Sequence, residues 1–313
     1  MSDAVISASG LTKYFGKKCV VDQVSFEVPR GSVTAFLGRN GSGKTTTLRM
    51  LLGMMEPTRG GSTILGHDSQ RIPPRARAQI GYLAENHPLV PWMTVNQARR
   101  FQAAFYPRWN QGIFDATVDH FGLDRGTKAG SLSRVQREGL ALACTLAPEP
   151  ELLVLDDPAL GLDPVARRAL LESILFIMRT PHRTVLLSSH LLDDIERVAD
   201  YLLILDRSVL RAACPLEVFR ERIAQYQLTF ESEPPPLPEI PGLLDTLRVN
   251  HMLRVTVANP REDLDAVLYG LHPIELQKQP LNFQDAITAY MSDHRSRGFF
   301  LEMAEEGKGK GAA

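Results

Sequence analysis

The residues best suited to chemistry lie in one short stretch, residues 38–45, whose sequence is GRNGSGKT. Its spacing fits the phosphate-binding pattern G-x-x-x-x-G-K-[ST]. Glycines let the backbone curl around an anion and point successive N–H groups at it. Lys44 can then reach terminal phosphates, and Thr45 can place its hydroxyl on Mg²⁺. The stretch predicts binding of a nucleoside triphosphate; the alternative is a Gly/Ser turn that matches the pattern by chance.

A second group of candidate residues follows two apolar runs further along the chain. Residues 152–155 (LLVL) lead into Asp156 and Asp157, as expected for a central parallel strand that delivers carboxylates at its C-terminal edge. Asp156 would hold Mg²⁺, through water, and Asp157 would lie near the attacking water. Residues 184–188 predict another strand, which leads to His190. A histidine there can hydrogen-bond the terminal phosphate; the alternative is a structural histidine.

The elements that must position these side chains can also be predicted. Residues 33–37 (VTAFL) predict a buried strand before the glycine-rich stretch, and Leu48, Leu51 and Leu52 recur at helical spacing after it. The stretch therefore falls where a strand turns into a helix, and the positive N-terminal end of that helix faces the anion. Residues 57–61 (PTRGG), further along, predict a loop.

A helical pattern replaces the strand pattern between about residues 86 and 150. Amphipathic segments at 94–106, 112–121 and 133–146 are separated by proline, glycine and asparagine. These segments predict a helical unit inserted into the α/β core.

From about residue 5 to residue 215 the chain resembles an ATP-binding cassette (ABC) ATPase, the nucleotide-binding subunit of an ABC transporter. Phe15 matches the aromatic residue on which adenine stacks in that family. Residues 38–45 match its Walker A loop, and residues 152–156 match its Walker B strand. These motifs occur in the order that the family has.

Further motifs extend the resemblance. Residues 159–163 (ALGLD) match the loop that crosses to the partner subunit, and His190 matches the switch histidine. The resemblance implies catalytic roles for Asp157 and His190, and it implies Mg²⁺ bound by Thr45, Glu85 and Asp156. It implies an ATP site formed by Phe15, Gly38, Arg39, Asn40, Gly41, Ser42, Gly43, Lys44, Thr45, Thr46, Glu85, Ser133, Gln136 and Asp163.

Three motifs depart from the family's pattern. Glu85 stands where a glutamine is usual, a mild change because glutamate still ligates Mg²⁺. Asp157 replaces the glutamate that serves as general base, and this shorter side chain predicts slow hydrolysis. The signature LSGGQ reads LSRVQ at residues 132–136, so Arg134 and Val135 replace two glycines that permit close backbone approach to phosphate. Arg134 would either obstruct dimer closure or add positive charge near the phosphates.

The resemblance also suggests where a membrane partner would dock. In the family, the groove beside residues 86–93 (NHPLVPWM) receives a cytoplasmic helix of the transmembrane subunit. The alternative is a tight turn with Trp92 packed inward.

Composition sets limits on the class of protein. The chain has 313 residues, 44% of them hydrophobic, enough for one large α/β core and a smaller unit. A formal net charge of −1 provides no global basic field, so we expect no nucleic-acid partner. The isolated cysteines Cys19, Cys144 and Cys214 suit reduced cytosolic thiols. We see no signal peptide and no run of eighteen apolar residues, so we expect a cytoplasmic protein, peripheral at the inner face of the cell membrane.

The C-terminal third follows a different pattern. Residues 215–223 predict a short helix and 226–231 a strand, and the proline-rich residues 234–238 (PPPLP) predict an extended linker. Runs at 247–249 and 253–257 predict a β-hairpin.

Two more helices are predicted at 263–269 and 283–291. We therefore expect an ABC ATP-binding domain at 1–225, an accessory domain at 226–301 and a disordered tail at 302–313. The accessory unit would serve dimer contact or regulation, or it would only stabilise the cassette.

These observations favour an α/β P-loop NTPase core of ABC type with an inserted helical subdomain and a small α+β C-terminal accessory unit. The expected function is binding of ATP and Mg²⁺, hydrolysis, and coupling of dimer closure to a transmembrane permease subunit on a separate chain. The dimer would be a homodimer or a heterodimer of ABC subunits. The alternative is a soluble regulatory switch module with slow or incidental hydrolysis, and a DNA-repair cassette is disfavoured because no long heptad segment interrupts the core.

Overall fold

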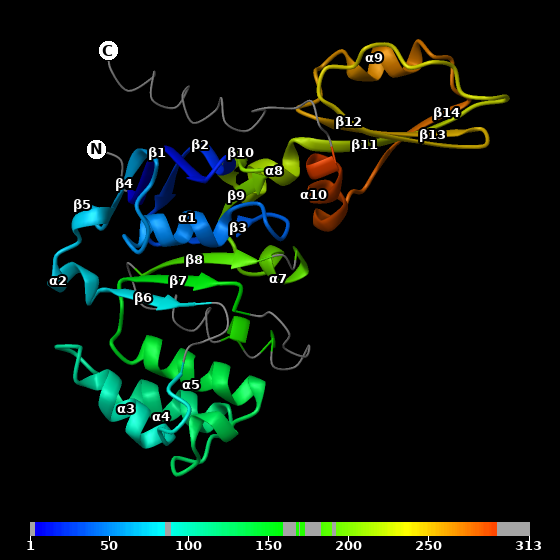
Figure 1. Cartoon of the computed structure of the whole chain (residues 1–313). Helices are drawn as coiled ribbons and strands as arrows, with labels where there is room; N and C mark the ends of the chain where they lie inside the picture. Colours follow the sequence, from blue (N-terminus) through cyan, green and yellow to red (C-terminus); the bar gives the residue numbers. More distant parts are fainter. Residues whose placement is uncertain are drawn as a thin grey trace.

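The computed structural model describes residues 4–84, 89–158, 167–168, 170–172, 183–189 and 192–292 (Figure 1). Within these ranges the strands form three sheets, one of six strands and two of four. The predicted site residues Glu85, Asp163 and His190 and the predicted tail at 302–313 lie outside the described residues.

The six-stranded sheet forms the centre of the molecule, in the order β10-β9-β3-β8-β7-β6. Its strands are β3 (Val33–Leu37), β6 (Ile80–Leu83), β7 (Leu152–Asp156), β8 (Thr184–Ser189), β9 (Tyr201–Asp206) and β10 (Val209–Pro215). The neighbours from β9 to β6 run parallel, and β10 is antiparallel to β9. Every residue of β3, β7 and β8 is buried, as expected for parallel strands covered on both faces. The three strands predicted here are confirmed.

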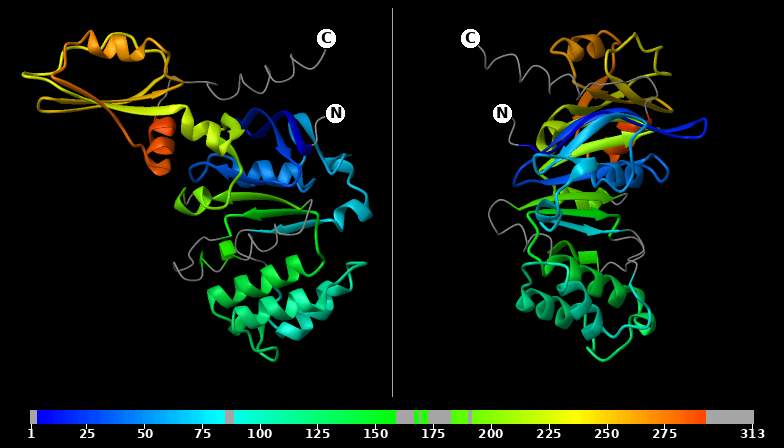
Figure 2. Two further views of the ribbon diagram at one scale, coloured as in Figure 1. Left: turned by 180° about the vertical axis from the view of Figure 1, so that it is seen from behind. Right: turned by 60° about the vertical axis from the view of Figure 1, so that its left-hand side comes forward.

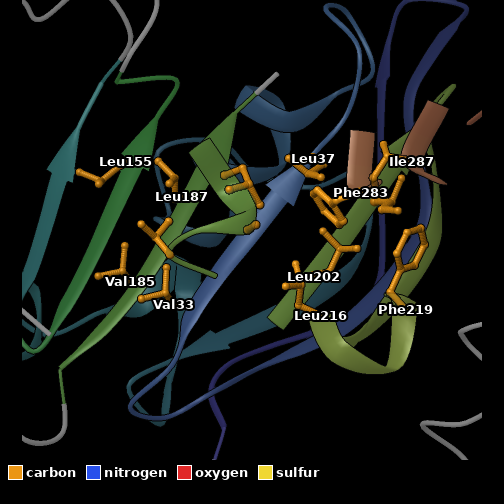
Figure 3. Packing of buried hydrophobic residues seen from close by; sticks show 14 of the residues in the cluster. Val33, Leu37, Leu155, Val185, Leu187, Leu202, Leu216, Phe219, Phe283 and Ile287 are labelled. Atoms are coloured by element: carbon orange, nitrogen blue, oxygen red, sulfur yellow. The ribbon is translucent and has the colours of Figure 1, made fainter. Parts of the chain in front are cut away.

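Alternate side chains of these strands enter two different hydrophobic cores. Ala35 and Leu37 of β3 belong to the core that Figure 3 shows, together with Leu155, Val185 and Leu187. Phe36 points to the other face, where it packs with α1 (Lys44–Leu51) and the antiparallel sheet. This alternation is the two-residue period of a strand.

The antiparallel sheet has the order β2-β1-β4-β5. Its strands are β1 (Ala4–Phe15), β2 (Lys18–Pro29), β4 (Arg59–Ile64) and β5 (His67–Asp68), and it is followed by a 3-10 turn, η1 (Ser69–Arg71), and by α2 (Pro74–Arg77). The prediction of a loop over residues 57–61 is wrong from Arg59 onward. Gly60 adopts φ 75°, and a Cβ there would come within 2.3 Å of the Gly10 carbonyl oxygen, so these glycines permit close strand pairing.

The helical subdomain contains the three predicted helices, α3 (Val95–Ala103), α4 (Gln111–His120) and α5 (Arg134–Leu146). It also contains a short 3-10 helix, η2 (Ala129–Ser131), that was not predicted. Thr94 caps α3 and Ser133 caps α5, each in a reciprocal capping box with the glutamine three residues later. A separate core joins the helices, with Phe114 and Val118 packed against Leu140. The subdomain lies at the opposite end of the molecule from the C-terminal sheet (Figures 1 and 2).

The C-terminal sheet has the order β12-β13-β11-β14. Its elements are β11 (Ile223–Thr229), β12 (Leu243–Val249), β13 (Met252–Ala258) and β14 (Glu275–Gln279), with α9 (Leu264–Tyr269) beside them. The predicted hairpin is confirmed as β12 and β13, which pair in antiparallel register around Asn250 at φ 52°. Two helices flank the sheet in sequence, α8 (Leu216–Glu221) before it and α10 (Phe283–Ser292) after it.

Helix α10 returns from this sheet to the cassette. Phe283 and Ile287 lie beside Phe219 and Leu202 in the central core (Figure 3). The Tyr290 hydroxyl donates to the carbonyl oxygen of Arg211 on β10 at 2.6 Å. The accessory sheet is therefore joined to the cassette by α8, which precedes it in the chain, and by α10, which follows it.

In the described residues, no helix combines the length and the apolar character needed to cross a lipid bilayer.

Candidate functional site

The glycine-rich loop lies between β3 and α1, where the sequence predicts it. Gly41 and Gly43 adopt φ 79° and 109°, and Gly43 is the N-cap residue of α1. A Cβ on Gly43 would come within 2.5 Å of the Val20 carbonyl oxygen. Glycine is therefore needed at this position for two reasons, backbone conformation and close packing.

Lys44 is held inside the loop. Its side chain is 7% exposed, and its ammonium group donates to the carbonyl oxygens of Gly38 at 2.6 Å and Arg39 at 3.3 Å. These bonds keep a positive charge at the mouth of the loop, beside the N-terminus of α1. Both features attract an anion.

A cavity of about 380 Å³ joins the loop to the end of β7. Its lining residues are Val20, Asn40, Gly41, Gly43, Lys44, Thr45, Thr46, Asp156 and Asp157. The predicted phosphate-binding residues and the predicted carboxylates thus meet in one hollow, although they lie more than a hundred residues apart in the sequence.

Asp156 is 1% exposed, so its carboxylate depends on hydrogen bonds from the protein. The Thr45 hydroxyl donates to its Oδ1 at 3.1 Å, and the Ser188 hydroxyl donates to the same oxygen at 2.9 Å. The Tyr82 hydroxyl lies 3.5 Å from Oδ2. Burial, followed by the charge of Asp156, raises the pKa of Tyr82 to about 12, which keeps this phenol a proton donor.

This group of oxygens fits a magnesium ion. Mg²⁺ prefers hard oxygen ligands such as a carboxylate and a hydroxyl, and Asp156 and Thr45 supply both against one cavity. The hydroxyls of Thr45 and Ser188 are neutral, so a divalent cation would stabilise the buried carboxylate that they contact. Glu85, the third expected ligand, lies outside the described residues.

Asp157 turns the chain away from the end of β7. Its φ of 49° lies in the left-handed region, which aspartate tolerates better than most residues. Its backbone N–H donates to the Ser188 hydroxyl at 2.9 Å. The side chain, which is half-buried, borders the same cavity as Lys44 and Asp156.

Phe15 ends β1 with half of its surface exposed, and the Lys13 ammonium lies 5.6 Å from the centre of its ring. An exposed aromatic ring can stack on a base. Phe15 does not line the cavity at the loop.

The altered signature begins α5 on the surface of the helical subdomain. Ser133 and Arg134 are exposed, while Val135 packs against the central core. The Ser133 hydroxyl accepts the backbone N–H of Gln136 at 3.2 Å, and the Gln136 side chain accepts the backbone N–H of Ser133 at 3.1 Å. The structure does not bring Ser133 or Gln136 to the cavity at the loop. The N-terminus of α5 is instead presented outward.

Two neighbours of the site were not predicted. Ser188 and Tyr82 contact Asp156 from the adjacent strands β8 and β6. A polar residue at the end of an apolar strand is a sequence signal for such a role. Knowing that such a residue contacts Asp156 requires the order and register of the strands, which cannot be read from the sequence around it.

Comparison with known proteins identifies the family to which this chain belongs. The ABC transporter family model matches residues 21–160. The chain is 31% identical over 224 residues to the bacitracin transport ATP-binding protein of Bacillus licheniformis, an alignment that covers 71% of this chain and 73% of the relative.

Two further matches agree with it. The chain is 37% identical to a probable multidrug ABC transporter ATP-binding protein of Escherichia coli (strain K12), over 62% of this chain but only 34% of the relative. A solved structure described as the ATP-binding subunit of an ABC transporter aligns with a TM-score of 0.63 and 29% identity, over 69% of this chain and 92% of that one. The chain therefore belongs to the ATP-binding subunits of ABC transporters, a family of ATPases.

Proposed function

We propose that this chain binds MgATP in the cavity between the glycine-rich loop and Asp156, and hydrolyses it by in-line attack of water on the γ-phosphate. One observation carries the proposal: a single cavity is lined by Lys44 and Thr45 on one side and by Asp156 and Asp157 on the other. Phosphate chemistry needs a cation-rich cradle and a carboxylate within reach of water, and both border this space.

The side chains in this proposal act as follows. Phosphate oxygens replace the carbonyl oxygens of Gly38 and Arg39 as partners of the Lys44 ammonium, and the loop amides share the remaining charge. Thr45 and Asp156 would hold Mg²⁺, which when bound neutralises charge on the β- and γ-phosphates. Asp157 polarises the attacking water.

Residues at the edges and outside the described ranges complete the proposed site. Phe15 stacks on adenine, His190 holds the γ-phosphate, and Glu85 contributes to the Mg²⁺ site. The exposed position of Phe15 supports the first of these roles.

We further propose that two ABC subunits, identical or different, close over two ATP molecules, and that Asp163 and the N-terminus of α5 face the partner's nucleotide. The outward presentation of Ser133 and Arg134 supports this arrangement. The Ser133 hydroxyl caps α5 by accepting a hydrogen bond, so its own proton is still available for donation to a phosphate oxygen.

The transmembrane permease would be a separate chain that docks on the helical subdomain and holds this subunit at the inner face of the membrane. Trp92 supports this proposal because its side chain is 71% exposed, so the alternative of a tight turn with Trp92 packed inward is wrong. Phe101 and Phe105 are also exposed and contact one another on the same subdomain. Exposed aromatic residues are typical of interface cores.

Nucleotide binding is tested by Lys44→Ala, with Lys278→Ala on the accessory sheet as a control that removes an exposed lysine. We expect Lys44→Ala to lose MgATP binding by calorimetry while its circular dichroism stays unchanged. Near-normal ATP affinity in that variant would contradict the proposed site.

Docking is tested by co-expressing this chain with a polytopic membrane protein as the candidate permease and measuring their co-purification. We expect Trp92→Ala to reduce the recovered complex without changing ATP affinity. Full recovery would place the permease contact elsewhere.

A further inference from the structure

Ser188 lies beside the metal-binding carboxylate of the proposed site, one strand away. Strands β7 and β8 run parallel, and Asp156 pairs in register with Ser188. Ser188 is fully buried, so water cannot substitute for the groups that it contacts. Its position is set by the sheet itself and not by a loop.

The Ser188 hydroxyl makes two hydrogen bonds in opposite senses. It donates to Asp156 Oδ1 at 2.9 Å and accepts the backbone N–H of Asp157 at 2.9 Å. A hydroxyl carries one proton and two lone pairs, so it can make both bonds at the same time. Using its only proton on Asp156 fixes the direction in which this hydroxyl points.

The first bond orients the Asp156 carboxylate. The Thr45 hydroxyl also donates to Oδ1, at 3.1 Å, so two donors from different elements converge on one oxygen. Oδ2 is the other oxygen, with the Tyr82 hydroxyl 3.5 Å away. The carboxylate plane is therefore held by β8 and α1 together.

The second bond orients Asp157. This residue adopts φ 49°, a conformation that is uncommon outside glycine and that needs support from its surroundings. The bond from its N–H to Ser188 anchors the turn at the point where the chain leaves β7. The direction of the Asp157 side chain into the cavity follows from that turn.

We propose that Ser188 is a positioning residue for ATP hydrolysis, which sets Asp156 and Asp157 relative to each other through one hydroxyl. The proposal rests on the roles assigned above to these two carboxylates. Ser188 itself does not line the cavity in which the nucleotide is proposed to bind. Groups that orient a metal ligand typically change metal affinity or activity by 10–100-fold when removed.

The test is Ser188→Ala, compared with Ser32→Ala. Ser32 is also a buried serine, and its hydroxyl donates to the Pro29 carbonyl oxygen just before β3, at the other end of the sheet. We expect kcat of Ser188→Ala to fall about 10–100-fold while KM for ATP changes less than about threefold. Ser32→Ala should keep kcat within about twofold of the parent.

A binding measurement separates positioning from general damage. Mn²⁺ serves as the probe, and its affinity for the protein with bound ATP is measured by electron paramagnetic resonance. We expect Ser188→Ala to weaken Mn²⁺ binding by about 10-fold or more, and to keep the affinity for ATP measured by calorimetry in EDTA. Unchanged Mn²⁺ affinity together with unchanged kcat would overturn the proposal.

Rescue by conservative variants completes the design. Ser188→Thr keeps the hydroxyl and should recover most of the lost Mn²⁺ affinity, whereas Ser188→Cys, with a weak donor of similar shape, should not. Comparison of Ser188→Thr with Ser188→Cys tests the positioning role even if Ser188→Ala does not fold. Equal Mn²⁺ affinity and kcat in the two variants would contradict the proposal. A failure of the proposed ATP site itself would show separately, as retained ATP binding in Lys44→Ala.

Discussion

The two ends of the central sheet carry polar side chains of different character. At the carboxyl ends of β3, β7 and β8, Asp156 and Ser188 are buried and joined by a hydrogen bond beside the cavity of about 380 Å³. At the amino ends lies a larger cavity, of about 660 Å³. Arg30, Arg183, Glu149 and Glu151 are among the residues that line it.

The charges at the amino ends pair with one another. Arg183 donates to Glu149 at 3.2 Å, and Arg30 forms an ion pair with Glu151. The side chains of Glu149 and Glu151 are 42% and 31% exposed, so water can replace a lost partner. Cavity size therefore does not identify the reactive end of this sheet. Buried polar groups that share one network identify it, because none of them can be removed without leaving another unsatisfied.

The largest expected effect is that of Asp157→Asn at the carboxyl end. Asparagine tolerates φ 49° as aspartate does, so the fold should be kept while the water-polarising carboxylate is lost. We expect kcat to fall about 10²–10⁴-fold and an ATP-bound dimer to accumulate in gel filtration. Asp157→Glu, which lengthens the side chain, should raise kcat above that of the parent. Hydrolysis by the asparagine variant at the parent's rate would remove Asp157 from catalysis.

A smaller but clear effect is expected for Gly43→Ala in the glycine-rich loop. A Cβ there would meet the Val20 carbonyl oxygen at 2.5 Å, at a φ of 109° that alanine rarely adopts. We expect a loss of about 1–3 kcal/mol in the free energy of unfolding and at least about a 10-fold loss of ATP affinity, measured by thermal denaturation and calorimetry. Gly61→Ala is the matched control, because no atom lies within 4 Å of a Cβ at that position. Equal behaviour of the two variants would show that the loop does not need its glycine.

The smallest effect is expected at the amino end. Glu149→Gln removes the ion pair with Arg183, whose side chain is 13% exposed. We expect the free energy of unfolding to change by less than about 1 kcal/mol and the ATPase rate to stay the same. A large fall in turnover would mean that the amino end also carries function, and the contrast drawn above would be wrong.

Much of the cassette could be predicted from the sequence because its signals are local. The strand at Val33–Leu37, the loop after it and the strand at Leu152–Asp156 are apolar runs or glycine patterns that can be read without knowing the fold. The capped helices at Val95–Ala103 and Arg134–Leu146 were also found by their spacing. Such signals depend only on residues that are close in the sequence.

Other features depend on partners that are distant in sequence. The contact of Ser188 with Asp156 follows from strand register, and the exposure of Trp92 follows from how its loop sits on the subdomain. Arg59 to Gly61 looked like a loop because glycines favour turns, but pairing with β1 makes them part of a strand. The roles of Glu85, Asp163 and His190 stay predictions.

Helix α10 has a consequence for how the accessory sheet and the cassette unfold. Phe283, Ile287 and Tyr290 share a core with Phe219 of α8 and with strands of the central sheet. Leu244 of β12 belongs to the same core, although the accessory sheet also has an apolar core of its own. Residues of the accessory unit thus form part of the hydrophobic core of the cassette, and removing the unit would expose apolar surface of the cassette to water. Heat or denaturant should melt the two parts in one cooperative transition, as a single thermodynamic unit with two sheets.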